Sequence, residues 1–503
     1  MIRQRSFAVQ SATIHGVEAL PVLVEVVISN GIPSFSIVGM ADATIMESRE
    51  RIKAALRASG FVMPTDKIVI NLAPGALKKT GSGFDLPIAL GILAATQQID
   101  PQAISTSLVV GELSLDGSVR GSAGMLAYQK CALENGWDVL TGITDQGIVS
   151  LEGLTCRCLE QLSHIRENRF VSHRVLSGGQ SSEQIDYADV VSHEAAKRAL
   201  QVAAAGKHGV LMVGPPGSGK TMLAQRFATI LPELKESEKI EAALVHSVAG
   251  EDISEILAGR RPFRSPHHSA TAAGLVGGGR PPHPGEASLA HQGVLFLDEL
   301  AEFKSSVLQT LRQPLETGTI VLTRADGTYV FPARFQLIAA TNPCPCGYFG
   351  DSSGKCHCSA SVVQAYQNRM GGPLIDRIDM RIDVWQERSE ELFDLSYGKS
   401  SADLREGVEK AQHFAQKRIA TQGSHTKGLR ALKDACNFDN DTESFFLSLA
   451  NNKEMSARSI SKTLMLSRTI ADIAESKQVS KAHIAEAFAL RFGGAYTNER
   501  FVA

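Results

Sequence analysis

The sequence predicts an α/β protein in which two α/β units are followed by a helical carboxyl-terminal part. Patterns of buried strands and of helices alternate up to about residue 387, and charged helical patterns dominate after it. A polar, uneven stretch at residues 167–186 interrupts these patterns and indicates a linker. The chain has 503 residues. A single core rarely grows beyond about 300 residues, so we expect two or three domains.

The first unit covers residues 1–166. A strand-like run is followed by a helix that ends at Gly60, and then by a buried strand and a buried helix. These segments are, in order, LPVLVEVVIS, SRERIKAALRASG, KIVINLAP and FDLPIALGILAAT. A hairpin is predicted over SLVVGELSLDGSVRG, with its turn at Asp116 and Gly117.

The second unit spans residues 187–387, and the helical part spans residues 388–503. Helical periodicity in the last part is clearest in SARSISKTLMLSRTIADIAES and VSKAHIAEAFALR. No internal repeat and no long low-complexity segment interrupts this organisation.

Composition excludes some classes of protein. Hydrophobic residues make up 43% and charged residues 21% of the chain, as in ordinary globular proteins. The amino terminus has no apolar segment of the signal-peptide type, and no apolar run approaches the roughly 20 residues of a membrane span. We therefore expect a cytoplasmic protein with no membrane partner. The net charge of −2 argues against a surface coated in positive charge, but a ring can confine basic groups to its pore.

A phosphate-binding loop is predicted between a strand and a helix in residues 208–228. The match to G-x-x-x-x-G-K-[ST] runs from Gly214 to Thr221. Glycines let backbone N–H groups curl around phosphate oxygens, and Lys220 reaches the β- and γ-phosphates of ATP while the Thr221 hydroxyl holds Mg²⁺. The residues expected to contact the nucleotide are Gly214, Pro215, Pro216, Gly217, Ser218, Gly219, Lys220, Thr221 and Met222.

Polar residues end two further strand patterns. GVLFLDE ends in Asp298, a candidate Mg²⁺ partner, and Glu299, a candidate to polarise the attacking water. FQLIAATN ends in Asn342, whose amide would orient this water or sense the γ-phosphate. Alternatively, Asn342 only starts the turn before Pro343.

Two arginines are further catalytic candidates. Arg377 follows a predicted helix in GGPLIDRIDM and is placed to reach the γ-phosphate of a neighbouring subunit. Alternatively, Arg377 only forms an ion pair with Asp376 or Asp379 on the surface. Arg458, in the helical part, is a candidate second phosphate sensor.

These motifs together resemble the ComM/YifB family, bacterial relatives of the magnesium-chelatase ATPase subunit. The resemblance covers nearly the whole chain and also includes the amino-terminal stretches SFSIVGMAD, KIVINLAPGALKKTGSGFDLPIA and VVGELSLDGSVRG. The other matching segments are GPPGSGKT, RPFRSPHHSAT, GEASLAHQGVLFLDEL, LRQPLETG, PARFQLIAATNPCPCG, PLIDRIDM and the SARSISK helix.

The resemblance implies a fold and a function. The first unit would have a Lon-protease-like fold, the second would be an AAA+ ATPase core, and the helical part would be its lid. Such modules assemble as rings, commonly hexamers, with ATP between subunits. In ComM-like members the implied activity is helicase-driven branch migration of single-stranded or branched DNA during natural transformation and homologous recombination.

Peptidase chemistry is not expected in the first unit. A Lon-type site needs a serine nucleophile and a lysine base. The nucleophile position aligns with Gly83, although Ser82 is adjacent, and the lysine position falls near Tyr128. A scaffold or DNA-gripping role is expected instead.

Two segments are candidates for DNA contact. The resemblance places residues 261–290, rich in Gly, Pro and His, as an insert in the second helix of the ATPase core. Residues 319–335 predict a hairpin with its turn at Asp326 and Gly327, which points into the pore in related helicases. Arg324 could bind a phosphate there, or be merely solvated. His267 and His268 could contact DNA, or serve packing or capping.

Four cysteines form a candidate zinc site. Two C-x-C pairs lie in CPCGYFGDSSGKCHC, at Cys344, Cys346, Cys356 and Cys358. Four thiolates can close tetrahedrally around a structural Zn²⁺, and His357 could replace one of them. The alternative is a loop with free thiols.

Four classes of function remain open. The leading hypothesis is a DNA-dependent ATPase, and the second is a chelatase-type motor acting on a partner enzyme. The Lon-like first unit counts against the second hypothesis, because the resemblance implies that the chelatase ATPase subunit lacks such a unit. A third class is a protein remodeller or ATP-dependent protease. A fourth is an ATP-binding switch, which would need neither Glu299 nor Arg377.

Overall fold

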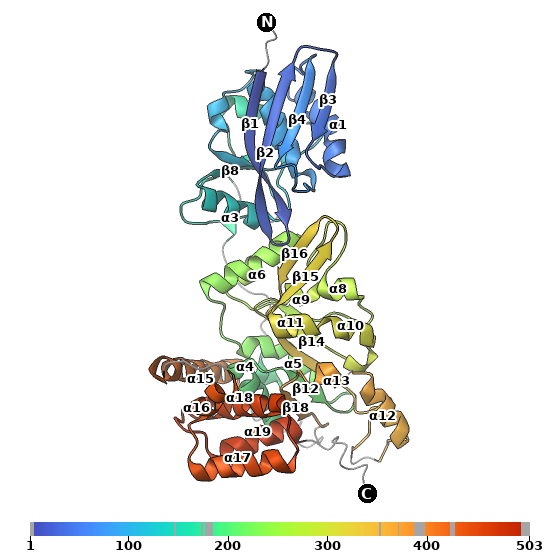
Figure 1. Cartoon of the computed structure of the whole chain (residues 1–503), viewed down its shortest axis with the longest axis vertical. Helices are drawn as coiled ribbons and strands as arrows, with labels where there is room; N and C mark the ends of the chain where they lie inside the picture. The colour runs from blue at the N-terminus through green and yellow to red at the C-terminus, as the bar shows by residue number, and fades with distance from the viewer. Residues whose placement is uncertain are drawn as a thin grey trace.

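Three parts follow one another along the long axis of the molecule (Figure 1). The computed structural model describes residues 5–144, 147–172, 175–176, 185–351, 354–370, 372–386, 398–422 and 428–493. The amino-terminal part lies at one end, the part with the glycine-rich loop lies in the middle, and the carboxyl-terminal helices lie at the other end.

A seven-stranded mixed sheet forms the amino-terminal part, in the order β10-β8-β5-β1-β2-β4-β3. The pairs β1–β2 and β2–β4 are antiparallel, and the other pairs are parallel. The strands are β1 (Arg5–His15), β2 (Glu18–Ser29), β3 (Ser34–Val38), β4 (Lys67–Ala73), β5 (Ser107–Val109), β8 (Asp138–Gly142) and β10 (Cys156–Leu159). The helices are α1 (Ala43–Ala58), α2 (Asp85–Ala95) and α3 (Met125–Asn135). Two short ribbons pair β6 (Glu112–Leu113) with β7 (Val119–Arg120) and β9 (Ile148–Val149) with β11 (Val175–Leu176).

The predicted elements of this part are confirmed except for one strand. The four apolar segments lie in β2, α1, β4 and α2, and every residue of α2 is buried. The hairpin prediction is wrong for Ser107–Val109, because these residues form β5 inside the main sheet. All three are buried, as expected of a strand covered on both faces. Only β6 and β7 flank the turn at Asp116 and Gly117.

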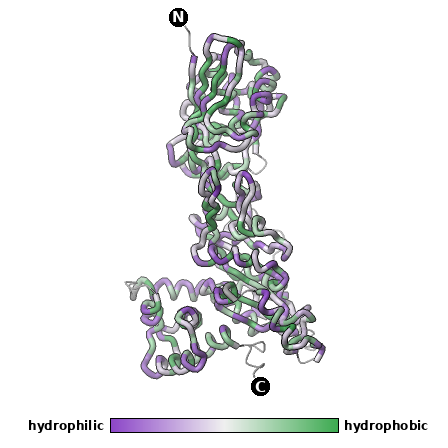
Figure 2. Tube along the Cα trace, turned by 45° about the vertical axis from the view of Figure 1, so that its right-hand side comes forward, coloured by the Kyte–Doolittle hydropathy of each residue, from purple (hydrophilic) through white to green (hydrophobic). Residues whose placement is uncertain are grey.

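The middle part contains an all-parallel five-stranded sheet, in the order β13-β14-β17-β12-β18. Its strands are β12 (Val210–Val213), β13 (Phe263–Arg264), β14 (Val294–Leu297), β17 (Gln336–Thr341) and β18 (Met380–Asp383). Every residue of β12, β14 and β17 is buried, which suits a parallel sheet covered on both faces. Hydrophobic colour follows these strands, while the carboxyl-terminal helices alternate between polar and apolar residues (Figure 2).

Ten short and medium helices and one hairpin surround this sheet in the described residues. The helices are α4 (Glu194–Gly206), α5 (Lys220–Phe227), α6 (Glu236–Ala249), α7 (Ser254–Leu257), α8 (Ala272–Val276), α9 (Glu286–Leu289), α10 (Ser305–Thr310), α11 (Arg312–Thr317), α12 (Ala360–Asn368) and α13 (Gly372–Ile375). The hairpin consists of β15 (Thr319–Arg324) and β16 (Gly327–Pro332).

Two sequence expectations for the middle part need correction. The turn of the hairpin lies one residue earlier than predicted, at Ala325 and Asp326, because Arg324 pairs with Gly327. Gly327 has φ of +146°, which L side chains rarely adopt, so the glycine is needed just after the turn. Residues 261–290 are not simply an insert in a helix, because they begin with β13, which pairs in parallel with β14.

The carboxyl-terminal part consists of the helices α15 (Ser401–Gln422), α16 (Leu429–Cys436), α17 (Asn440–Asn452), α18 (Ala457–Ile473) and α19 (Lys481–Phe492). Of these helices, α15 and α18 pack against α4. Lys462 on α18 pairs with Asp379, just before β18, at 2.8 Å. Burial opposes ionisation of Asp379, but His208 and Lys462 outweigh it and lower the pKa of this carboxyl. No helix in the described part of the chain is both long and apolar enough to cross a membrane.

The amino-terminal and middle parts share a core and a polar contact. Helix α3 packs on α6, and residues of both helices belong to one hydrophobic cluster. The turn between β1 and β2 reaches the β15–β16 hairpin, where the rings of His15 and Tyr329 stack with centroids 4.2 Å apart. Lys78 pairs with Asp326 in the hairpin turn at 2.7 Å. The amino-terminal part therefore braces the hairpin.

Candidate nucleotide-binding and hydrolysis site

The glycine-rich loop joins β12 to α5 at the carboxyl edge of the parallel sheet. Gly217 and Gly219 have φ of +74° and +83°, in the left-handed region that favours glycine. A Cβ on Gly214 would collide with the carbonyl oxygen of Val384. Helix α5 begins at Lys220. Ligands of open α/β sheets bind at this edge, and the first N–H groups of a helix favour anions.

Lys220 is buried, with 8% of its surface exposed, and its amine is anchored in the loop. Nζ donates to the carbonyl oxygens of Gly214 and Pro215 at 2.9 and 2.8 Å. It lies 3.4 Å from Oδ1 of Asn342, at the end of β17. Burial lowers the pKa of Lys220, and the charge of Asp298 opposes this shift. The motif lysine and the candidate sensor amide thus lie together.

Thr221 and Asp298 place two oxygen ligands side by side. The Thr221 hydroxyl donates to Oδ2 of Asp298 at 2.7 Å. The other carboxylate oxygen, Oδ1, accepts from the backbone N–H of Glu299 at 2.9 Å. A hydroxyl and a carboxylate are hard oxygen donors of the kind that Mg²⁺ prefers, so these residues fit such an ion.

Glu299 extends from the same edge in a less common backbone conformation. Its φ of +50° is in the left-handed region. Its carboxylate pairs with Nδ1 of His268 at 3.1 Å. The sequence placed His268 among possible DNA contacts, whereas the structure joins it to the candidate catalytic acid.

Arg377 and Arg458 meet at one carboxylate. Both guanidinium groups pair with Oε1 of Glu316 on α11, and the distance from Arg458 is 3.6 Å. The side chain of Arg377 is 15% exposed and that of Arg458 is 46% exposed. Sequence reasoning missed Glu316, because no spacing rule relates it to either arginine.

The four clustered cysteines lie close enough to hold one ion. Sγ of Cys344 is 3.3 Å from that of Cys346 and 3.8 Å from that of Cys356, and all four Sγ atoms lie within 4.8 Å of one another. Zinc–sulfur bonds of about 2.3 Å in a tetrahedron require sulfur atoms about 3.8 Å apart. Burial raises the pKa of Cys346, but the Tyr348 N–H and the neighbouring thiols outweigh it and lower the value to about 6.

This cysteine loop contacts the phosphate-binding loop. A Cβ on Gly347 would lie 2.5 Å from Cδ of Pro216, so the two loops approach closely. His357 is exposed and does not belong to the group of four sulfur ligands. A change in the conformation of the cysteine loop would therefore shift Pro216 in the phosphate-binding loop.

The region aligned with a peptidase dyad has different chemistry. Gly83 has no side chain to act as a nucleophile, and a Cβ there would lie 2.8 Å from Oγ of Ser122. The Ser82 hydroxyl donates to the Glu112 carboxylate rather than to an amine. Tyr128 is buried, and desolvation raises the pKa of its hydroxyl.

The remaining candidates for DNA contact lie at the hairpin and in the loop after β13. Arg324 is exposed at the end of β15, and its Nη2 lies 3.9 Å from a Cβ position on Gly278. His267 and His268 pack with ring centroids 4.0 Å apart. Nδ1 of His267 lies 2.8 Å from Oγ of Ser269.

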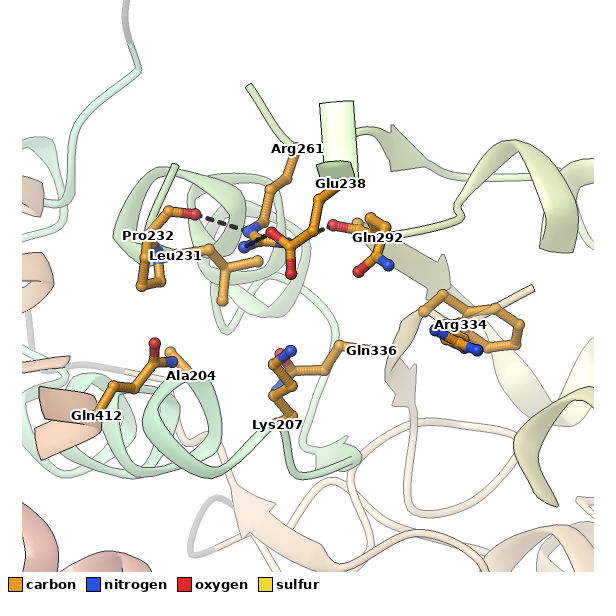
Figure 3. Close-up of a pocket in the computed structure, with 12 residues that line it drawn as sticks. Ala204, Lys207, Leu231, Pro232, Glu238, Arg261, Gln292, Arg334, Gln336 and Gln412 are labelled. Carbon is orange, nitrogen blue, oxygen red and sulfur yellow. Dashed lines mark hydrogen bonds and ion pairs between the residues drawn. The ribbon is translucent and has the colours of Figure 1, made fainter. Parts of the chain in front are cut away.

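A cavity of about 320 Å³ lies at the opposite, amino edge of the sheet (Figure 3). Gly293, just before β14, and Gln336, the first residue of β17, line it. Arg261 is fixed there by the carbonyl oxygens of Pro232 and Gln292, both at 2.7 Å, and by Glu238 at 3.2 Å. Because phosphate-binding residues lie at the other edge, this cavity is separate from the nucleotide site. The sequence contained no signal for it.

Three family models match the chain. "Magnesium chelatase, subunit ChlI" matches residues 186–392, "Subunit ChlI of Mg-chelatase" matches 24–141, and "Magnesium chelatase, subunit ChlI C-terminal" matches 398–491. The matched ranges fall one in each part of the molecule.

Similar proteins include two that match almost end to end. The competence protein ComM of Haemophilus influenzae is 39% identical over 491 residues, and an uncharacterized protein YifB of Salmonella typhimurium is 38% identical over 483 residues. Each alignment covers 95% of both chains. The magnesium-chelatase 67 kDa subunit of Chlorobaculum parvum is 29% identical over 163 residues, which is 32% of this chain and 23% of that protein.

Proposed function

Because this chain belongs to the ComM/YifB family, which is related to the magnesium-chelatase subunit, we propose that it is an ATP-driven DNA motor. The observation that carries this proposal is the meeting of Lys220, Thr221, Asp298, Glu299 and Asn342 at the carboxyl edge of one parallel sheet. A protein that only binds ATP needs the loop but not a carboxylate for water. The proposed reaction is hydrolysis of the γ-phosphate.

Each group has a role in this reaction. The loop from Gly214 to Met222 binds the phosphates, and Lys220 moves its amine from the loop carbonyls to the β- and γ-phosphates. Thr221 and Asp298 would hold Mg²⁺, which would neutralise charge on the phosphate oxygens. Glu299 polarises the attacking water, and Asn342 orients it.

We propose that the motor is a homo-oligomeric ring. In a ring, Arg377 reaches the γ-phosphate bound by the next subunit, and Arg458 adds a second positive charge. Their joint pairing with Glu316 supports one shared role. A hexamer is the form that the family resemblance implies.

The proposal that the motor acts on DNA rests on the β15–β16 hairpin and on one similar protein. A relative that is 39% identical is named a competence protein, which supports an involvement with DNA. Exposed Arg324 on the hairpin would contact phosphates of single-stranded or branched DNA. The proposed activity is helicase-driven branch migration during natural transformation and homologous recombination. The amino-terminal part would have a Lon-like fold without a working dyad and would serve as a scaffold.

We also propose a structural zinc at Cys344, Cys346, Cys356 and Cys358. Four protein ligands would leave no open position on the ion, so it would take no part in hydrolysis. Its effect would be to order the loop that contacts Pro216.

A chelatase-type or protein-remodelling motor is the second candidate. The magnesium-chelatase models favour it. One of them matches residues 24–141, so the amino-terminal part does not count against this candidate as the sequence had suggested. A partner protein, rather than DNA, would then stimulate hydrolysis.

Strand displacement from a fluorescent branched DNA tests the proposal. Purified protein, ATP and Mg²⁺ should separate the strands, and Glu299→Gln should bind ATP without doing so. ATP hydrolysis without DNA binding or movement would refute the DNA motor and favour the second candidate.

A further inference from the structure

The cavity at the amino edge of the parallel sheet gathers more positive than negative charge. Lys207, Arg261 and Arg334 are the basic residues among those that line it, and Glu238 is the acidic one (Figure 3). Its walls come from α4, α6, α15 and the residues that precede β14 and β17. A volume of about 320 Å³ lies near the lower end of the range of small-molecule sites, about 300–1,000 Å³. A molecule bound in this cavity would therefore be small and would contact several elements at once.

Arg261 and Glu238 form a fixed wall of the cavity. Nη2 of Arg261 donates to Oε2 of Glu238 at 3.2 Å, and the backbone N–H of Lys235 donates to the same oxygen at 3.2 Å. In the part of the chain that the structure describes, no donor binds the other carboxylate oxygen, Oε1. This pair therefore offers the cavity one oxygen that can accept a hydrogen bond from a hydroxyl group.

Arg334 is fixed at its backbone and at the base of its side chain. Its N–H donates to Nδ1 of His291 at 3.0 Å, and its carbonyl oxygen accepts from the N–H of Gln292 at 2.7 Å. A Cβ on Gly318 would lie 2.8 Å from Cγ of Arg334, so the side chain packs closely there. The nearby carboxylate of Glu241 binds the side chains of His291 and Gln292 instead, at 3.2 and 3.1 Å. Within the described ranges, the Arg334 guanidinium makes no hydrogen bond or ion pair.

Lys207 is placed at the other side of the cavity by Gln336. Nε2 of Gln336 donates to the carbonyl oxygens of Ala203 and His208 at 2.8 and 2.7 Å, so the chain is held on both sides of Lys207. Lys207 has φ of +56° at the end of α4, and its side chain is exposed. No described residue forms a hydrogen bond or ion pair with its amine. The protein thus holds two basic residues at the cavity and leaves their charges without a partner.

We propose that this cavity binds a small phosphorylated molecule that carries hydroxyl groups, of the sugar-phosphate class. Arg334 and Lys207 bind the phosphate, because a guanidinium offers it a fork of donors and an ammonium offers it a point charge. Oε1 of Glu238 accepts from a hydroxyl group of the sugar. This site is separate from the ATP site, which lies at the opposite edge of the sheet.

The test titrates ribose 5-phosphate into the full chain and follows binding by calorimetry. The titrated protein carries Lys220→Ala, because the glycine-rich loop also binds phosphates. One molecule should bind to each chain, and ribose without the phosphate should not bind measurably. Adding Arg334→Ala should raise Kd about tenfold or more, as expected for losing a charge-assisted hydrogen bond. Arg334→Lys should recover part of the loss, because it keeps the charge.

Two further variants check the hydroxyl contact and the background. Glu238→Gln should weaken binding of ribose 5-phosphate about threefold or more, because the hydrogen bond to a charged oxygen is lost. The same variant should bind inorganic phosphate at least as tightly, since a negative charge has been removed. Arg369→Ala removes an exposed arginine outside the cavity and should leave Kd unchanged. Circular dichroism and the unfolding temperature confirm that each variant is folded.

Three results would overturn the proposal. The first is that folded protein binds neither ribose 5-phosphate nor inorganic phosphate, or binds only the latter. In the second, ribose 5-phosphate binds, but Arg334→Ala and Lys207→Ala leave Kd unchanged, which places the phosphate elsewhere. In the third, a single-stranded oligonucleotide binds and both substitutions weaken it, while ribose 5-phosphate does not bind. The basic residues of the cavity would then contact DNA rather than a small molecule.

Discussion

The nucleotide site and the contact between the hairpin and the amino-terminal part are held together in different ways. At the nucleotide site, buried Lys220 is anchored by the loop itself, and Thr221 bonds to Asp298 only 77 positions away. At the hairpin, Lys78 meets Asp326 across 248 positions, and both side chains are partly exposed. Losing a buried polar contact costs more than losing an exposed ion pair. Substitutions at the nucleotide site should therefore abolish ATP hydrolysis. Substitutions at the hairpin contact should only weaken the stimulation of hydrolysis by DNA.

The largest effect is expected for Lys220→Ala. Removing the amine takes away the charge that neutralises the phosphates, and kcat for ATP hydrolysis should fall about 1,000-fold. Steady-state hydrolysis and binding of a fluorescent ATP analogue measure this loss. Lys433→Ala is the matched control, because Lys433 is exposed on α16, outside both the nucleotide site and the cavity. Turnover close to the wild type in Lys220→Ala would place hydrolysis elsewhere.

This contrast also explains what could be predicted from the sequence. The loop from Gly214 to Thr221 is contiguous, and Asp298 ends a recognisable buried strand, so local patterns were sufficient. Glu316 and the pairing of His268 with Glu299 depend on which strands and helices become neighbours, which no local pattern specifies. The hairpin was predicted, but its turn was misplaced by one residue, because cross-strand pairing rather than the Asp-Gly signal sets the register.

Arg377→Ala sharpens the comparison by testing whether the nucleotide site is complete in one chain. An electrostatic donor to the transferring phosphate is worth about 100- to 1,000-fold in kcat, and this loss is expected here. Mixing Arg377→Ala with Lys220→Ala subunits should restore part of the activity, since each variant supplies the group that the other lacks. Exposed Arg369→Ala is the control.

The mixture decides where Arg377 acts. Activity that exceeds the sum of the two variants supports action across a subunit boundary. No recovery, with both variants assembled, means that Arg377 acts within its own chain or only through Glu316.

Cys346→Ser should have an intermediate effect. Removing one of four thiolates weakens zinc binding, and the freed loop should loosen its contact with Pro216. We expect the variant to lose zinc to a mild chelator, to unfold at a lower temperature and to bind ATP less tightly. Zinc is measured by metal analysis of the purified protein, and Cys156→Ser, at a partly buried cysteine outside the cluster, is the control. Equal zinc content in Cys346→Ser and the wild type would contradict a zinc site at the four clustered cysteines.

His15→Ala should have the smallest effect, and it tests the second region directly. The stack of His15 on Tyr329 resembles an aromatic pair, which contributes about 0.5–1.5 kcal/mol. Urea unfolding should show a loss of stability within this range, and DNA-free ATP hydrolysis should be unchanged, because the nucleotide site lies on other elements. DNA-stimulated hydrolysis should fall modestly, since the hairpin loses one of its supports. Exposed His413→Ala, on α15, is the matched control. If His15→Ala abolished hydrolysis as Lys220→Ala should, the two regions would form one cooperative unit, and the amino-terminal part would belong to the motor rather than brace it.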